Sequence, residues 1–526
     1  MANQLPTQPG VFTRASSGMV RQVRTSDVFW FGWQTIALSY IVFTVFSWVF
    51  YPGASMELAT FISILFGLTI AACYALLAAV YPRSGAEYVF LSRSLHPAVG
   101  FALSFNFTFW QIFYVGLNGA FLSIYAIQPT IAAIGVQQQN QDILDVAAWF
   151  GDGWGLFLSA GVAILAILAL HLYGAGKYFK WQRIGSYIAV ASLVVTLVVL
   201  ILAAAGVLDF KANFDDLAGS GAYDGVISGG KDAGLSIGAP FSMSETLKFV
   251  LWPAFSLWFT ITAVSFSGEV KNVQKGQLYG LLGAVVAMGA TFIALMALYR
   301  GAFGTEFLQA ASNGTPLDAA PFTPLFTAIA GGNVVLTLIM STWVVTIAFF
   351  VLGTVFVYPS RTILAWSIDG MAPAKLGDVN SRYHSPHWSL IVCAAGGLFV
   401  LGLYSFTDKL GIVSGFLGLA INFLVVCVWS IFFPFVRRDV FENSPIAWRF
   451  GGVPVLSIMG AISTMGIVPV LYRLLVDKSF SLDLSYVVWG AVISVGGGFV
   501  WYVLWRAYEK ARGRGVDTQF AEIPVE

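Results

Sequence analysis

The sequence predicts an all-α integral membrane protein with about twelve transmembrane helices, and three observations support this prediction. The 526 residues are 58% hydrophobic and 10% charged, and their mean hydropathy is +0.80. Soluble domains are about 45–50% apolar and about 25% charged. Long apolar stretches recur along the whole chain, and nearly all charged residues lie between them. The composition excludes disordered, collagen-like and coiled-coil proteins and argues against a soluble enzyme.

Twelve apolar segments account for the predicted helices. A helix needs about 20 apolar residues to cross the hydrocarbon core. The segments are continuous rather than alternating, which favours helices over barrel strands. In chain order they cover roughly residues 28–50, 57–80, 99–127, 155–172, 184–206, 249–268, 277–299, 334–357, 388–405, 411–433, 454–474 and 486–505.

The stretches between these segments predict one membrane domain, residues 28–505, with short tails at 1–27 and 506–526. The two longest connections, 128–154 and 207–247, are too short to form separate domains. The second is rich in Gly, Asp and Ser, and a lid and a simple linker remain alternatives for it.

The basic residues predict how the protein is oriented. An even number of spans places both termini on one side of the membrane. That side holds 20 of the 27 Lys and Arg residues. Because basic residues concentrate in cytoplasmic loops, we expect a multi-pass protein of the cell membrane with both tails in the cytoplasm.

Charge and motif searches exclude several classes of function. The net charge is +1, which gives no reason to expect a nucleic-acid partner. No acidic or basic residue falls at the middle of a predicted span, and Glu57, Glu269 and Arg300 are expected near helix ends. A proton relay therefore lacks an obvious carrier in the sequence. No metal-ligand cluster or hydrolase motif is present, so we expect no metal, no cofactor and no enzymatic activity.

Uncharged polar residues gather in the first, third, sixth and eighth segments. They are Gln34, Thr35, Ser39, Tyr40, Asn106, Gln111, Tyr114, Asn118, Ser256, Thr260, Thr262, Ser341, Thr342, Thr346 and Thr354. One interpretation is interhelical hydrogen bonding, which is common in membrane bundles. The other is a shared binding site, because transporters with inverted repeats place their site where such helices meet near the midplane.

Three loop sequences resemble those of the amino acid–polyamine–organocation superfamily. YPRSGAEYVFLSRSLH at 81–96 follows the second segment, and GEVKN at 268–272 follows the sixth. SRTILAWSIDGMAP at 360–373 follows the eighth. The three motifs occur in the expected order, and the resemblance covers most of the chain.

This resemblance implies a secondary transporter with the leucine-transporter-like fold. Residues 28–206 and 249–433 would form two inverted repeats of five helices, and 454–505 would form helices 11 and 12. Helices 1 and 6 would be broken at the midplane, where helix ends and free carbonyls hold the substrate. Transport would proceed by alternating access.

The sequence departs from the family pattern at the expected helix breaks. The glycine-rich break of helix 1 falls on Leu38-Ser39-Tyr40, and the helix-6 region 254–260 lacks its glycine. Leu38, Tyr40 and Trp258 would therefore crowd or reshape the pocket. The helix-5 lysine of proton-coupled members is replaced by Ile188 or Ala189. Sodium held by Thr342 or Thr346 and a proton remain alternative coupling ions.

We therefore predict a transporter of amino acids or related small zwitterionic solutes, which acts on a small molecule within the lipid bilayer. A receptor on a transporter scaffold and a permease for an unrelated neutral solute, such as a nucleobase, remain alternatives. The sequence leaves the oligomeric state open. The expected substrate-binding residues are Ala37, Leu38, Ser39, Tyr40, Gln111, Tyr114, Ser256, Leu257, Trp258, Thr260 and Thr342.

Overall fold

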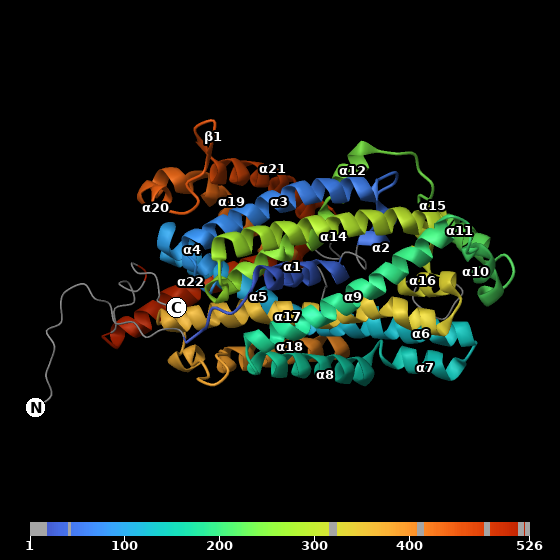
Figure 1. Cartoon of the computed structure of the whole chain (residues 1–526), viewed down its shortest axis with the longest axis horizontal. Helices are drawn as coiled ribbons and strands as arrows, with labels where there is room; N and C mark the ends of the chain where they lie inside the picture. Colours follow the sequence, from blue (N-terminus) through green and yellow to red (C-terminus); the bar gives the residue numbers. More distant parts are fainter. Residues whose placement is uncertain are drawn as a thin grey trace, which may run out of the picture.

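Nearly all of the regular structure is helical, and the long helices run side by side along the longest axis of the molecule (Figure 1). The computed structural model describes residues 18–39, 44–314, 323–407, 415–477, 484–513 and 520. Within these ranges, eleven helical stretches are long and apolar enough to cross a membrane. This confirms a multi-pass, helical membrane protein.

The eleven stretches coincide with the second to twelfth apolar segments. They are α3 (Met56–Val80), α5 with η3 and α6 (Pro97–Leu122, Ser123–Ile127, Gln128–Gln138), α8 (Gly153–Leu172), α9 (Ala175–Ala204), α12 with α13 and η4 (Met243–Phe249, Leu251–Leu257, Trp258–Glu269), α14 (Val273–Phe303), α17 (Val334–Ile368), α18 (His387–Phe406), α19 (Phe416–Val436), α21 (Val455–Val476) and α22 (Leu484–Ala511).

The first segment is helical on both sides of four residues that lie outside the described ranges. Helix α1 (Thr25–Ser39) precedes residues 40–43, and α2 (Val45–Ser47) and η2 (Trp48–Phe50) follow them. The start of α1 is capped by Asp27, whose Oδ2 accepts a hydrogen bond of 2.9 Å from the Arg24 N–H.

The sixth segment changes helix type halfway along. It is α-helical up to Leu257 and then continues as a 3₁₀ helix from Trp258 to Glu269. Runs of 3₁₀ helix longer than three or four residues are uncommon and often mark a hinge. The change falls within residues 254–260, where the sequence predicts an interruption.

Short helices fill the connections at the two ends of the bundle. Helices α7 (Gln141–Trp149), α10 (Phe210–Ala218), α11 (Ala222–Asp232), α15 (Thr305–Ala310), η5 (Ala311–Asn313) and α16 (Thr323–Gly331) belong to one end. The opposite end holds α4 (Glu87–Ser94), η6 (Ala374–Gly377), α20 (Arg438–Glu442) and a hairpin of β1 (Arg449–Phe450) and β2 (Val453–Pro454).

The long connection 207–247 is folded and packs on its neighbours. The Tyr223 ring of α11 stacks on Phe307 of α15 at 4.6 Å, and its hydroxyl donates to the Phe303 carbonyl. Lys231 pairs with Glu306 at 2.9 Å. These contacts attach the connection to the end of α14 and to α15.

Both ends of the described chain contact the same stretch after α17. The Gly18 carbonyl lies 3.0 Å from His384 Nδ1, and Trp505 Nε1 of α22 donates to the Gly370 carbonyl at 2.8 Å. The segment around Gly18 and the end of α22 therefore lie at the same end of the bundle.

Helices α5 and α18 approach closely at two glycines. A Cβ atom at Gly116 would lie 2.6 Å from the Gly397 carbonyl oxygen and 2.8 Å from Leu401 N. Small residues allow such backbone approach between membrane helices. The contact fixes the position of α5, which carries the polar residues discussed below.

We expect Gly116→Ala to destabilise the purified protein by about 1–3 kcal/mol, because the added methyl meets backbone atoms that side-chain rotation cannot clear. Gly402→Ala on α18 is the matched control, since its Cβ would lie at an ordinary 3.7 Å from Phe157. Denaturant unfolding in detergent measures both changes. Equal midpoints for the two variants would contradict the close approach.

Candidate functional site

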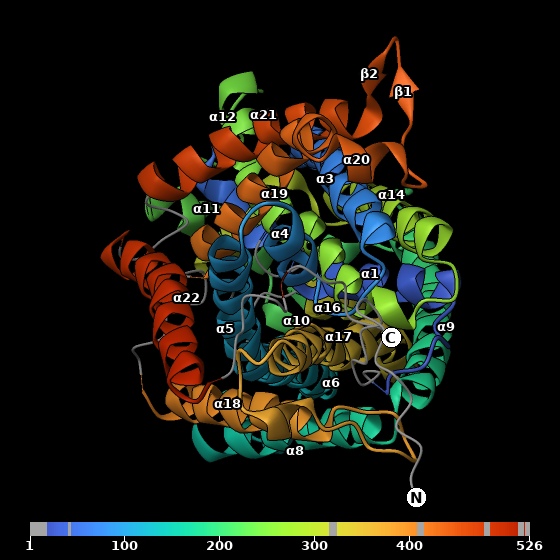
Figure 2. The same cartoon turned by 90° about the vertical axis from the view of Figure 1, so that its left-hand side faces the viewer.

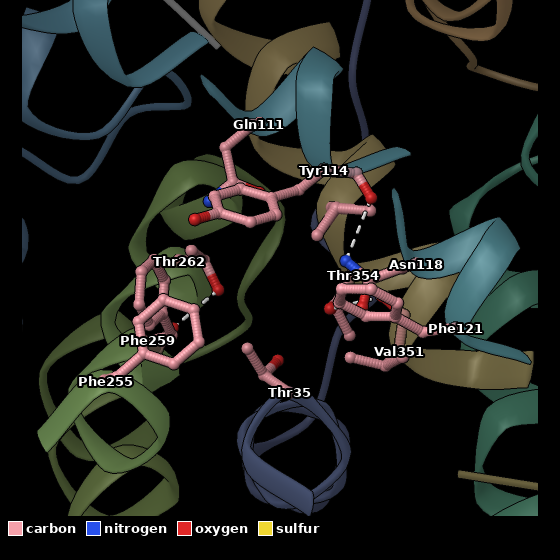
Figure 3. Close-up of a pocket in the computed structure, with 11 residues that line it drawn as sticks. Thr35, Gln111, Tyr114, Asn118, Phe121, Phe255, Phe259, Thr262, Val351 and Thr354 are labelled. Carbon is pink, nitrogen blue, oxygen red and sulfur yellow. Dashed lines mark hydrogen bonds between the residues drawn. The ribbon is translucent and has the colours of Figure 1, made fainter. Parts of the chain in front are cut away.

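A cavity lies between four helical segments (Figure 3). Its walls come from α1, from α5, from the α13–η4 segment and from α17. The lining residues are Thr35, Gln111, Tyr114, Asn118, Phe121, Phe255, Phe259, Thr262, Val351, Thr354 and Val355. These elements correspond to the first, third, sixth and eighth apolar segments, in which uncharged polar residues cluster.

Helical spacing explains why these residues face the cavity together. Gln111, Tyr114 and Asn118 are spaced by three and four residues, so they project from one face of α5. Phe255, Phe259 and Thr262 follow the same spacing in the sixth segment. The lining residues of α17 lie within two turns of each other for the same reason.

The cavity wall is aromatic and uncharged. Within the described residues, no Asp, Glu, Lys, Arg or His lines it. The ring centroids of Phe255 and Phe259 lie 5.8 Å apart, and the centroid of the Tyr114 ring lies 6.4 Å from that of Phe259. An aromatic wall with a few polar groups is the usual composition of a small-molecule site.

The threonine hydroxyls of the cavity already have partners in their own helices. Thr35 Oγ1 donates to the Phe31 carbonyl at 2.8 Å, Thr262 Oγ1 to the Phe259 carbonyl at 2.9 Å, and Thr354 Oγ1 to the Val351 carbonyl at 2.7 Å. Their donor is therefore used, but each hydroxyl oxygen keeps lone pairs that can accept a hydrogen bond.

Two polar groups of α5 are buried in the cavity without a hydrogen-bond partner. They are Gln111 Oε1 and the Tyr114 hydroxyl. Figure 3 shows both side chains directed toward Thr262 across the cavity. Leaving such a group unpaired costs about 1–3 kcal/mol. A bound solute with donor and acceptor groups would remove this cost.

The structure brings together two of the substrate-binding residues expected from sequence, Gln111 and Tyr114. It does not bring the four helix-6 candidates to the cavity. Ser256, Leu257, Trp258 and Thr260 are fully buried on other faces of the same segment. The family pattern predicted that the face with Ser256 and Thr260 lines the site. The helix instead presents Phe255, Phe259 and Thr262 to the cavity.

Trp258 does not crowd the cavity, contrary to the expectation from sequence. Its ring packs against α3, where Nε1 donates to the Ser63 carbonyl at 3.3 Å. Gly67 makes room for it, since a Cβ at that position would lie 3.3 Å from Trp258 Cδ1. The Trp258 side chain, in the region where the family pattern has a glycine, is thus packed between the sixth segment and α3.

The candidates on α17 lie away from the cavity. Thr342 is partly exposed, and its Oγ1 donates to the Leu338 carbonyl at 2.7 Å. It lies more than two turns before Val351, the first lining residue of this helix. Thr346 is partly exposed and does not line the cavity either. Neither hydroxyl that the sequence predicts for sodium therefore lies at the cavity.

The helix-1 candidates fall outside the part of the structure whose side chains are described. They are Ala37, Leu38, Ser39 and Tyr40. Thr35, one turn before Ser39, lines the cavity. Helix 1 therefore contributes Thr35 to the cavity wall.

Sequence reasoning missed most of the remaining lining residues. Thr35, Asn118, Thr262 and Thr354 carried a signal, because each belongs to the polar clusters of segments one, three, six and eight. The lining residues Phe121, Phe255, Phe259, Val351 and Val355 carried none. In segments with so many apolar residues, only the packing shows which ones face a cavity.

One comparison with known proteins bears on this site. The family model described as amino acid permease matches residues 24–500, which is most of the chain. The match includes all four segments that form the cavity.

Proposed function

Because the chain belongs to the amino acid permease family, and is thus a transmembrane amino acid transporter and not an enzyme, we propose that it carries small neutral, zwitterionic amino acids through the cavity of Figure 3. The observation that carries this proposal is the uncharged aromatic wall with the unpaired Gln111 and Tyr114 groups. A solute with net charge would lack a partner of opposite sign among the described lining residues.

Transport by alternating access is supported by the change of helix type beside the cavity. The sixth segment changes from α to 3₁₀ helix at Trp258, between the lining residues Phe255 and Phe259. We propose that the sixth segment and the first segment are the broken helices 6 and 1 of two inverted repeats, 28–206 and 249–433, followed by helices 11 and 12 at 454–505. Helix ends and unpaired backbone groups there would hold the carboxylate and ammonium of the substrate.

We further propose that both tails, 1–27 and 506–526, lie in the cytoplasm of a cell whose surface membrane holds the protein. The distribution of 20 of the 27 basic residues to that side supports this orientation. It places α4 and the β1–β2 hairpin on the cytoplasmic side and α10, α11 and α16 on the outer side.

Counterflow in proteoliposomes tests the proposed substrate class. Vesicles loaded with unlabelled L-alanine, L-serine, L-leucine or L-phenylalanine are mixed with a trace of the same labelled amino acid. We expect saturable uptake for at least one of these, above protein-free vesicles, and none for L-lysine or L-glutamate. Uptake restricted to the charged amino acids would overturn the zwitterionic assignment. Uptake of a nucleobase alone would overturn the assignment of this cavity to amino acids.

A further inference from the structure

Glu87 is a buried carboxylate behind the cavity. The sequence predicts residues 81–96 as a cytoplasmic loop, but residues 87–94 form α4, which lies among α3, α5 and α19 in the middle of the bundle end (Figure 2). Glu87 is 0% exposed there. The sequence predicts no charged residue at the middle of a span, and Glu87 lies between two predicted spans, so its burial was not visible in the sequence.

A constrained turn holds Glu87 in place. Gly85 adopts a φ of +115°, and its N–H donates to the Ser265 carbonyl of η4 at 2.9 Å. Ala86 adopts a φ of +49°, which residues other than glycine rarely do. Such strained positions persist only where the surrounding structure fixes them, and they cluster at functional sites. The turn thus links Glu87 to the end of the 3₁₀ helix.

The carboxyl group has one neutral hydrogen-bond partner. Glu87 Oε1 accepts from Asn422 Nδ2 of α19 at 2.8 Å, and Oε2 is buried without a partner. Among the described residues, no Lys, Arg or His forms an ion pair with it. Burial raises the pKa of Glu87 to about 7, although the hydrogen bond from Asn422 favours the charged form.

The titratable groups around Glu87 are otherwise neutral or already paired. Tyr74 of α3 and Tyr358 of α17 are its electrostatic neighbours, and Cys427 of α19 lies next to Tyr74. On α4 itself, Tyr88 donates to Asp369 Oδ2 at 2.6 Å, and Arg93 pairs with the same carboxylate. No charged residue of α5 faces it in the described chain. Glu87 is therefore the buried carboxyl in this group that has no charged partner among the described residues.

A chain of hydrogen bonds connects Glu87 to the cavity helix. Asn422 Oδ1 accepts from Asn106 Nδ2 at 2.6 Å, and Asn106 Oδ1 accepts from Ser494 Oγ at 2.6 Å. Trp110 Nε1 donates to Ser494 Oγ at 3.1 Å. Trp110 lies one helical turn before the lining residue Tyr114 on α5, so the chain of hydrogen bonds ends next to the cavity wall.

The helix α17 provides a second connection. Tyr358, which influences Glu87, lies one turn after the lining residue Thr354. Its ring packs at 4.3 Å on Phe107 of α5. The ring of Phe423 on α19 packs near two other rings. Its centroid lies 6.2 Å from that of Phe107 and 5.8 Å from that of the lining residue Phe259. Helices that form the cavity thus also form the pocket around the carboxyl group.

We propose that Glu87 is a proton-binding site outside the substrate cavity, and that its protonation is coupled to substrate binding and transport. The proposal rests on the proposed function. Protonation removes the buried charge, while the Asn422 N–H can still donate to the carboxyl oxygen. Deprotonation places a charge where α4, α17, α19 and the turn bonded to η4 meet. Because a buried charge without a counter-ion is costly, a rearrangement of these elements that admits water to the carboxylate becomes more favourable.

The sign of the pH effect on stability follows from the direction of the shift. The pKa of Glu87 is about 7 in the folded protein against 4.5 for an unperturbed group. Its contribution to stability is thus present at low pH and is lost as pH rises through about 7. Glu87→Gln removes the charge, so wild type should lose thermal stability relative to this variant as pH rises from about 4.5 to about 7, and the difference should stay constant at higher pH.

Proton-driven uptake of the neutral amino acid that gives counterflow tests the coupling. In wild-type vesicles with an acidic outer solution, we expect the amino acid to accumulate inside. When the pH is equal on both sides, we expect the rate of counterflow to change with pH, with a midpoint near pH 7. Glu87→Gln should keep counterflow but lose both the stimulation by the gradient and the pH midpoint. Glu306→Gln is the matched control, because Glu306 is half exposed and far from α4 in the fold. It should behave as wild type. A wild-type gradient response in Glu87→Gln would overturn the proposal.

A readout without substrate separates this proposal from the proposed function. Infrared difference spectra between about pH 5 and about pH 9 record protonated carboxyl groups. We expect a band that is absent from Glu87→Gln and present in Glu306→Gln. Asn422→Leu removes the donor that favours the carboxylate, so the midpoint of the band should move to higher pH. An unchanged midpoint, or a band that persists in Glu87→Gln, would contradict proton binding at Glu87. If wild-type protein showed no counterflow of any neutral amino acid while the band behaved as expected, only the substrate assignment would be refuted.

Discussion

Gln111→Leu is expected to weaken amino acid binding by about tenfold to a hundredfold. The variant keeps the volume of the side chain but removes the buried Oε1, which has no partner in the protein. A hydrogen bond to a charged group contributes about 1.5–3 kcal/mol, and each 1.4 kcal/mol is a factor of about ten in Kd. Titration of the purified protein with the amino acid that gives counterflow measures the change. Tyr114→Phe tests the second unpaired group in the same way.

Ser256→Ala provides the matched control for this loss. Ser256 is buried on the sixth segment with an unpaired hydroxyl, as Tyr114 is on α5, but it does not line the cavity. It is also a residue that the sequence places in the binding site. We expect wild-type affinity for Ser256→Ala. A loss of affinity in this variant with none in Gln111→Leu would place the substrate on the other face of helix 6.

Arg361→Met is expected to destabilise the protein by about 3–5 kcal/mol, because it leaves the Glu269 carboxylate buried without a counter-ion. Arg361 of α17 and Glu269 at the end of η4 form an ion pair. Arg361 Nε lies 2.9 Å from Glu269 Oε1, and Arg361 Nη2 lies 3.4 Å from Glu269 Oε2. The Arg361 side chain is 3% exposed and the Glu269 side chain is 1% exposed. The Glu269 carbonyl also accepts from the Val23 N–H at 2.9 Å. The pair therefore joins the segment before α1, the sixth segment and α17.

The double variant Glu269→Leu with Arg361→Met is the control for this prediction. Replacing both members of a buried pair by apolar residues is often nearly neutral. We expect denaturant unfolding in detergent to show the double variant closer to wild type than Arg361→Met alone. Additive losses in the double-mutant cycle would mean that the two side chains do not act as a pair.

The helices were predictable from the sequence because the bilayer fixes their length and composition. The segment read as 57–80 is α3 at Met56–Val80, and the one read as 388–405 is α18 at His387–Phe406. The connections were not predictable in the same way. Residues 128–154 and 207–247 lack long apolar runs, yet they form α6, α7, α10 and α11, because short helices gain stability from packing rather than from their own sequence.

The site was predictable by segment but only partly by residue. Polar clusters pointed to α1, α5, the sixth segment and α17, and these four form the cavity, which Gln111 and Tyr114 line. Counting along the family pattern chose Ser256 and Thr260, which lie one residue beyond the lining Phe255 and Phe259. A shift of one residue turns a side chain by about 100° around a helix, so the pattern cannot settle the face.

Buried charges were hidden by the assumption that motif loops stay in water. Glu87 and Arg361 both belong to loop motifs in the sequence, yet both side chains are inside the bundle. The loop after the second segment folds back as α4, and α17 continues as a helix to Ile368. Tertiary packing alone shows that these groups are shielded from solvent.

Protection of a cavity cysteine tests the central claim, that amino acids bind among Gln111, Tyr114 and their neighbours. Asn118→Cys places a thiol on the partly exposed lining position of α5, whereas the native Cys73, Cys393 and Cys427 are buried. The rate of labelling by a methanethiosulfonate reagent is measured with and without the amino acid that gives counterflow, and Ser228→Cys on the exposed face of α11 serves as control. We predict that the amino acid slows labelling at position 118 in proportion to occupancy and leaves position 228 unchanged. Labelling at position 118 that stays equally fast at saturating amino acid would contradict the claim.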